Sequence, residues 1–297
     1  MNNKNLNFFS LIMLFLTFTL NSCSEDSKLE QLESSDLKNK SYSANINPME
    51  FVGVEHNKFM TEFTALVEEH KNNGGFKDIE YLSDDFRDEM SVLLHQANNS
   101  YYPENNTTVE FYQNAYDSIN IKEIFTSRNN MLKSAQVVLS NQTTEKDKEF
   151  TMNLLNDILY YDNSNSKFKS LQDLIAYHES IILNESWKEN ETSALGAVAI
   201  AKHSNIFWTN SNFLNGDYEG KTTQSDPRSG IIVGADAAGY VIGGVVGGVA
   251  GTTVAGVTFG AGTVVGVIAG KFVGGFVGSG AAATGIEIYD AFTDFFD

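Results

Sequence analysis

A long uncharged segment near the C-terminus, in which glycine recurs at every fourth position, constrains the fold of this chain most strongly. No charged residue occurs from 237 to 270, and 11 of these 34 residues are glycine. Glycine is unfavourable inside helices and strands, because it loses more backbone freedom on folding than any other residue. The segment must therefore be stabilised by close contacts that larger side chains would prevent.

Two series of glycines have this spacing of four residues, and both fit a helix. A spacing of four places them along one slowly turning helix face, flanked by branched side chains. In a strand, the same face would alternate between glycine and bulky residues, so we favour the helix. Small residues on one face let two helices approach closely. The predicted helix-packing positions are Gly239, Gly243, Gly247, Gly251, Gly262, Gly266, Gly270, Gly274 and Gly278.

This pattern resembles a glycine zipper, which is found in membrane-inserting and pore-forming helices. The resemblance implies a helical hairpin over residues 230–285 that packs or oligomerises in or on a membrane. The alternative is a soluble, surface-exposed binding protein in which the hairpin is a buried packing element. A released membrane-active peptide is a third hypothesis, but such peptides are usually basic. From Gly230 onward this chain has one lysine and five acidic residues.

Two charged residues flank the uncharged segment, Asp236 before it and Lys271 after it. If the chain reverses at 252–255, each arm of the hairpin is about 22 Å long as a helix. Asp236 and Lys271 then lie level at the open end, where they could form an ion pair. Such a pair would lower the cost of burying either charge. A bend at 260–262 is the rival, and it would move the two residues out of register.

The N-terminus has the parts of a secretory signal. Lys4 lies in a short polar start, residues 8–20 are apolar, and the sequence Leu20–Cys23 follows. The apolar run is too short for a comfortable bilayer span. Residues 1–22 resemble a bacterial lipoprotein signal, which implies cleavage before Cys23 and lipidation of that residue. The implied location is the cell envelope, anchored in the outer membrane.

Acidic residues directly after Cys23 add to this interpretation. The sequence Ser24-Glu25-Asp26 looks like the surface-export signal of Bacteroidota lipoproteins, which implies exposure at the cell surface. A plain acidic tether is the alternative. In either case residues 23–46 are polar and are predicted to form a flexible tether.

Between the tether and the glycine-rich segment, the pattern is helical. Residues 47–210 have apolar positions at helical spacing, and the breakers between them are rich in Asn, Ser and Thr. They predict an all-α domain of six or seven helices, one of them from Ile121 to Leu139. Residues 211–229 form a polar linker to the hairpin. Residues 286–297 predict an amphipathic C-terminal helix.

Charge and motifs exclude several functions. The formal net charge of the chain is −18, whereas a nucleic-acid-binding protein needs a basic face. No two histidines have the His-x-x-x-His spacing of a helical metal site. Gly220-Lys221-Thr222 lacks the earlier glycine that a phosphate-binding loop requires. His56 lies on an apolar helix face, which indicates a hydrogen-bonded core histidine.

We therefore expect a non-catalytic envelope protein that uses no metal or cofactor. Its expected partner is membrane lipid, through Cys23 and through the glycine-rich segment. A second copy of the chain is a further expected partner, because glycine faces can also pack between molecules.

Lipidation of Cys23 can be tested directly on the mature protein. Mass spectrometry of the N-terminal peptide should show a cysteine carrying acyl chains, since cleavage before Cys23 creates that terminus. An N-terminus at Met1, or at an unmodified residue after Cys23, would contradict both the anchor and the envelope location.

Overall fold

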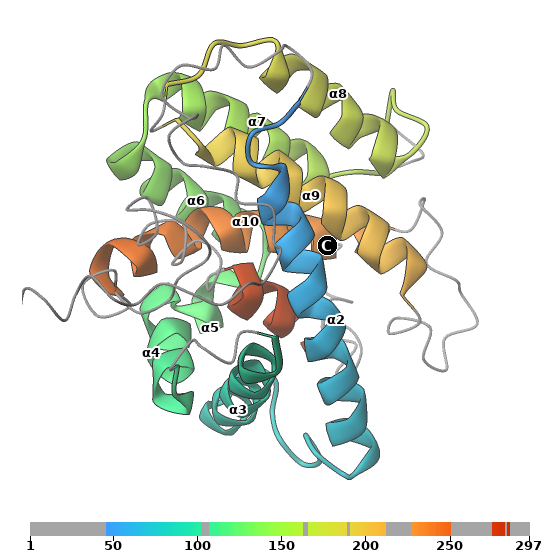
Figure 1. Cartoon of the computed structure of the whole chain (residues 1–297), viewed down its shortest axis with the longest axis vertical. Coiled ribbons are helices and arrows are strands. Elements are labelled where there is room, and N and C mark those ends of the chain that lie inside the picture. The colour runs from blue at the N-terminus through green and yellow to red at the C-terminus, as the bar shows by residue number, and fades with distance from the viewer. Residues whose placement is uncertain are drawn as a thin grey trace, which may run out of the picture. The chain divides into compact units, whose positions relative to one another are not determined.

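The computed structural model describes residues 46–101, 107–162, 166–188, 191–211, 227–250, 275–282 and 284–285. All of them belong to one compact unit within Ser41–Asp297. Every regular element in these ranges is a helix (Figure 1). The all-α prediction is thus confirmed for this part of the chain. The predicted signal, Cys23, the tether up to residue 45 and the predicted helix over 286–297 lie outside the described residues.

The helices follow one another from α2 to α10, and a short helical stretch comes after them. Their bounds are α2 (Glu50–Asn72), α3 (Asp84–Tyr101), α4 (Val109–Ile119), α5 (Ile121–Ile124), α6 (Arg128–Gln142), α7 (Glu145–Leu159), α8 (Leu171–Leu183), α9 (Ser193–Asn210) and α10 (Pro227–Ala250). The helical residues 275–282 and 284–285 are called the C-terminal segment below. In the described part of 47–210 there are eight helices, where six or seven were predicted.

The predicted helix from Ile121 to Leu139 is wrong, because the chain divides there into α5 and α6. Asn120, with φ of 56°, ends α4 in the left-handed region, and α5 is only one turn long. The Ser127 side chain then accepts a hydrogen bond from the backbone N–H of Asn130. A serine in this position starts a new helix by satisfying a free N–H group, and the apolar spacing did not reveal it.

Side-chain caps start several of the other helices in the same way. Ser83 accepts a hydrogen bond from the N–H of Phe86 before α3. Thr108, Thr144 and Ser170 each accept one from the N–H three residues later, at α4, α7 and α8. Such caps contribute about 1 kcal/mol each. They explain why the Ser- and Thr-rich breakers coincide with helix starts.

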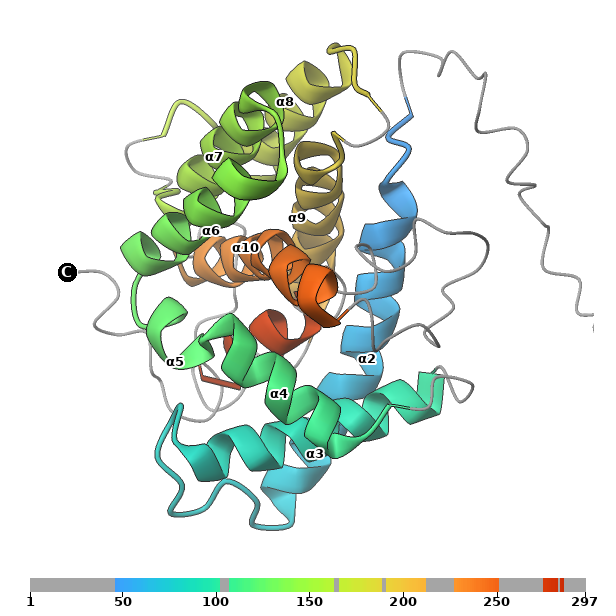
Figure 2. The same ribbon diagram turned by 90° about the vertical axis from the view of Figure 1, so that its left-hand side faces the viewer.

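Helix α10 occupies the centre of the bundle (Figures 1 and 2). It packs against α4, α6, α7 and α9, and every residue from 229 to 243 is buried. The C-terminal segment is buried as well, and it lies beside α2 and α10 in both views. The part of the glycine-rich region whose burial is described is therefore core, and the helices of residues 47–210 enclose it.

Two glycines outside the predicted series make this packing close. A Cβ atom on Gly53 of α2 would lie 2.4 Å from the carbonyl oxygen of Ala199 in α9. One on Gly196 of α9 would lie 2.1 Å from the hydroxyl oxygen of Tyr240 in α10. Real Cβ atoms do not approach so closely, so a larger residue at Gly53 would push α2 and α9 apart, and one at Gly196 would displace the Tyr240 ring.

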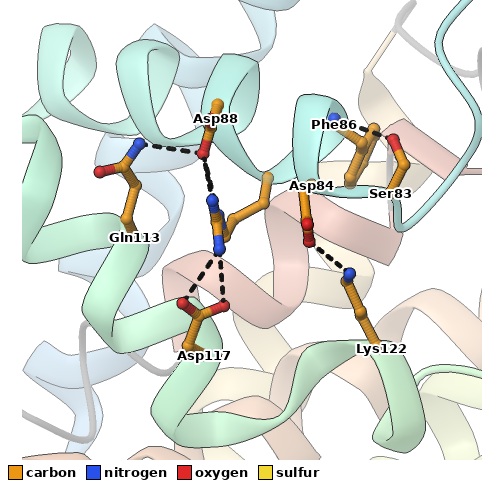
Figure 3. Close-up of polar contacts among 8 residues, drawn as sticks. Ser83, Asp84, Phe86, Asp88, Gln113, Asp117 and Lys122 are labelled. Carbon is orange, nitrogen blue, oxygen red and sulfur yellow. Dashed lines mark hydrogen bonds and ion pairs between the residues drawn. The ribbon is translucent and has the colours of Figure 1, made fainter.

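Ion pairs on the surface join α3 to its neighbours (Figure 3). Arg87 Nη1 lies 3.1 Å from Asp117 Oδ2 on α4, and Lys122 Nζ of α5 lies 2.5 Å from Asp84 Oδ1. Exposed pairs of this kind add little to stability. They connect α3 to α4 and α5, and of these α4 packs against α10.

Candidate functional site

A cluster of five polar side chains lies in the core where α10 and the C-terminal segment meet the other helices. Its members are fully or almost fully buried: His56, Ser204, Trp208, Asp236 and Ser279. They come from α2, α9, α10 and the C-terminal segment, which are far apart in the sequence. We call this group the Asp236 cluster. Burying polar groups is costly unless they bond to one another, so their partners decide what the cluster does.

The carboxylate of Asp236 takes its hydrogen bonds from α9. Its Oδ2 atom accepts one from the Ser204 hydroxyl at 2.5 Å and one from Trp208 Nε1 at 2.8 Å. Both donors are side chains of one helix, a turn apart. They fix the position of α10 along α9, because a shift of α10 by one residue would break both bonds.

His56 forms the second half of the cluster. Its Nε2 atom lies 2.8 Å from Ser279 Oγ and 3.9 Å from Asp236 Oδ2. Burial raises the pKa of Asp236, and interaction with the Ser279 side chain opposes this shift. The serine hydroxyl therefore bonds the histidine ring and interacts with the carboxyl group, and it brings the C-terminal segment into the same network.

The tautomer of His56 follows from its neighbour Asn57. The Asn57 side-chain NH₂ donates to the carbonyl oxygen of His203 at 2.7 Å, which turns its Oδ1 atom toward His56 Nδ1 at 3.3 Å. An amide oxygen only accepts, so Nδ1 carries the proton. His56 Nε2 is then free to accept from the Ser279 hydroxyl.

Burial shifts the pKa values of His56 and Asp236 in opposite directions. Desolvation lowers the pKa of His56, and the nearby carboxylate of Asp236 partly opposes this shift. Desolvation raises the pKa of Asp236, against the effects of His56 and of its hydrogen-bond donors. In both cases the core favours the uncharged form.

The arrangement differs from that of a hydrolytic triad, although serine, histidine and aspartate are all present. In a triad the carboxylate orients the histidine through Nδ1, and the serine bonds Nε2. Here Nδ1 faces Asn57, and the carboxyl group of Asp236 lies on the serine side. The three side chains are 0% exposed, so a substrate cannot reach them in this state. The geometry supports a role in holding the helices together.

Further contacts hold the C-terminal segment in place. The Phe276 ring stacks on Phe59 of α2 with ring centroids 3.8 Å apart. The Tyr81 hydroxyl donates to the carbonyl oxygen of Ala281 at 3.2 Å. These contacts attach the segment to α2 and to the turn before α3.

The structure brings together two of the predicted helix-packing glycines. A Cβ atom on Gly278 would lie 3.1 Å from the Cα atom of Gly239 and 3.0 Å from Phe125 Cζ. Gly243 is buried in α10, and Gly247 also lies in that helix. Gly251, Gly262, Gly266, Gly270 and Gly274 lie outside the described residues, as does the predicted turn at 252–255.

The predicted partner of Asp236 also lies outside the described residues. Lys271 is not placed, so its proposed ion pair stays a prediction. What the structure adds is that Asp236 Oδ2 already accepts hydrogen bonds from Ser204 and Trp208 of α9.

Sequence reasoning placed His56 in the core, where the structure also has it, but it did not identify the Asp236 cluster. One signal was present, since Asp236 is the only charge between residues 229 and 270. A lone charge in an apolar helix requires a buried partner. Which of the polar residues of α2 and α9 would supply it depends on how the helices cross, and that is a tertiary property.

In the described ranges no group of three or more His, Cys, Asp and Glu side chains is arranged to hold a metal ion. Comparison of the chain with protein-family models, with curated proteins and with solved structures gives no match. The function must therefore be inferred from the geometry of this chain alone.

Replacing Gly278 tests the close contact with Gly239. We expect Gly278→Ala to lower the free energy of unfolding by about 1 kcal/mol, because the added methyl group meets backbone and an aromatic ring. Gly275→Ala in the same segment is the matched control. Its Cβ atom would lie no closer than 3.8 Å to any neighbour, so we expect no loss. If the two substitutions lower the free energy of unfolding in urea equally, close approach is not the reason why residue 278 is a glycine.

Removing the carboxylate of Asp236 tests the cluster. We expect Asp236→Ala to destabilise the protein by about 3 kcal/mol, because the buried donors of Ser204 and Trp208 lose their acceptor. Asp157→Ala is the control: Asp157 also bonds a buried histidine, His178, but its side chain is 45% exposed. It should cost less than about 1 kcal/mol. Denaturant titration of both variants gives the comparison, and similar losses would contradict a special role for Asp236.

Proposed function

We propose that this chain is a lipid-anchored, non-catalytic protein of the cell envelope whose glycine-rich tail acts in or on a membrane after leaving the helical body. The tail means residues 227–285, and the body means α2–α9. One observation supports the proposal: every tail residue whose burial is described is enclosed by the body. A body that encloses an apolar tail can carry it through water and release it to lipid.

The energetics allow such a transfer. Apolar surface gains about 25 cal/mol per Å² on leaving water, and it gains this in the body and in a bilayer alike. Close packing between glycine faces is also available in both places. The balance between body and membrane therefore depends on the specific contacts of the tail, and small changes in those contacts can shift it.

The charge of the protein indicates which membranes the tail could enter. Without residues 1–22 the chain has 19 basic and 38 acidic residues, so anionic headgroups would repel it. A zwitterionic surface avoids this repulsion. A lipid on Cys23 would keep the tail close to such a surface and raise its effective concentration there.

A second candidate is that the tail never leaves, and that the protein is a binding lipoprotein with a permanently packed core. The buried carboxylate of Asp236 favours this candidate, because a charge within a bilayer is costly. In addition, no helix in the described part of the chain has the length and apolarity needed to cross a membrane. An experiment on tail release separates the two candidates.

A disulfide between tail and body provides this experiment. A Cβ atom on Gly230 would lie 3.5 Å from the Cβ atom of Tyr161, within the range of disulfides. It would also lie 2.8 Å from the carbonyl oxygen of Ile158, so α10 and α7 must shift slightly to admit it, and the reduced protein is the reference for this effect. Gly230→Cys with Tyr161→Cys, in the chain starting at Ser24, ties α10 to the end of α7. We expect the reduced protein to bind phosphatidylcholine vesicles and the oxidised protein to bind several-fold less.

A second disulfide within the tail is the matched control. A Cβ atom on Gly275 would lie 3.9 Å from that of Tyr240, so cysteines at these positions join α10 to the C-terminal segment without fixing either to the body. Oxidation of this pair should leave vesicle flotation unchanged. If neither reduced protein binds vesicles, the permanently packed core is correct and the membrane proposal fails.

A further inference from the structure

The buried pair of His56 and Asp236 has to balance its own charge. Each side chain is 0% exposed, and Nε2 and Oδ2 are 3.9 Å apart. Asp236 and Arg228 are the only charged residues in the sequence of α10. A net charge in this part of the core would be expensive, because neither water nor a counterion reaches it.

Other titratable groups near the pair do not supply that charge. His203 of α9 is the nearest, and its electrostatic effect lowers the pKa of His56. Its Nε2 atom bonds Glu50 Oε1 at 2.8 Å, and Glu50 also pairs with Lys202 at the partly exposed crossing of α2 and α9. Tyr240, one turn after Asp236, stays neutral because burial raises its pKa. These groups are therefore paired at the crossing of α2 and α9 or neutral, and the electrostatic effect of His203 on His56 adds to that of burial.

A pair of one acid and one base is neutral only when it holds one proton. With two protons it is cationic, and with none it is anionic. Coupled groups titrate as a unit, so burial widens the pH range over which this unit keeps a single proton. The two separate pKa directions agree with this, since burial raises that of Asp236 and lowers that of His56.

We propose that His56 and Asp236, with Ser279 hydrogen bonded to His56, form a proton-dependent latch that keeps the tail in the body while the pair holds one proton and loosens it when that proton is lost. Ser279 is the direct connection to the C-terminal segment, and Asp236 is the connection to α10. The latch rests on the proposed function in one respect only, which is that the opened tail would enter a membrane.

The sign of the pH effect follows from proton counting. Once exposed, the two groups have ordinary pKa values of 3.8 and 6.5, so the open pair also holds one proton between these values. Because both states hold one proton in that range, the equilibrium between the closed and the open state does not depend on pH there. Above about pH 6.5 the open pair has lost its proton while the closed pair keeps it, so rising pH favours opening. Below about pH 3.8 the open pair takes up a second proton, so strong acid favours opening as well.

Labelling of a buried thiol measures the opening. In the chain starting at Ser24, Ala282→Cys places the only cysteine in the C-terminal segment, where Ala282 is 0% exposed. The labelling rate is divided by the rate of the same variant in concentrated urea at the same pH. This ratio corrects for the change of the intrinsic reactivity of the thiol with pH. We expect a constant ratio between about pH 4.5 and 6, and a rise above about pH 6.5 of up to tenfold per pH unit, the maximum for one proton.

Substitutions in the pair should change this profile in opposite ways. With Asp236→Asn only His56 titrates, so the ratio should not rise above about pH 6.5 and should rise as the pH falls below it. With His56→Gln only Asp236 titrates, and the ratio should rise with pH from about pH 4 upward. His178→Gln, which removes another buried histidine, should keep the original profile. A flat original profile above pH 6.5, or the same rise with Asp236→Asn, would overturn the latch.

Two controls separate the latch from global unfolding and from membrane binding. Ala97→Cys reports on α3, where Ala97 is 0% exposed. Its ratio should stay constant, and a parallel rise would overturn a latch specific to the tail. The labelling uses no vesicles, so a pH-dependent opening without vesicle binding would reject the proposed function and keep the latch. Vesicle binding without pH-dependent opening would reject the latch and keep the proposed function.

Discussion

The position of α10 depends on one buried carboxylate. Asp236 is the only charge in a long apolar stretch, and its hydrogen bonds come from Ser204 and Trp208 of α9. Because those bonds are lost if α10 slides or rotates, they select one register for a helix whose apolar surface would fit several. Hydrophobic burial brings the tail into the core, and the polar contacts determine where it stops.

The glycines explain how so many helices fit around one central helix. A close crossing is possible only where neither helix has a side chain in the way, as at Gly53 against Ala199 and at Gly278 against Gly239. Each glycine costs about 1 kcal/mol of helix propensity, and dense packing along the contact offsets this. Glycine spacing that is typical of membrane helices thus also suits the centre of a helical bundle.

The described part of the tail therefore forms one folded unit with the body, and this is the basis of the functional proposal. The change in composition after residue 210 predicts a hairpin separated from the body by a linker. In the structure, however, α10 contacts four helices of the body. An apolar element held by a small number of polar contacts can be released when those contacts fail. In the proposed latch, the His56–Asp236 pair supplies the contacts that respond to a change in protonation.

The sequence by itself determined the all-α class and the placement of His56 in the core, because helical periodicity is a local property. It did not determine the division between α5 and α6, which depends on one serine cap, Ser127. Tertiary structure alone decided that α10 lies at the centre and that Asp236 meets His56, Ser204, Trp208 and Ser279. These contacts join residues far apart in the chain, and they depend on helix crossings for which the periodicity of a single helix contains no information.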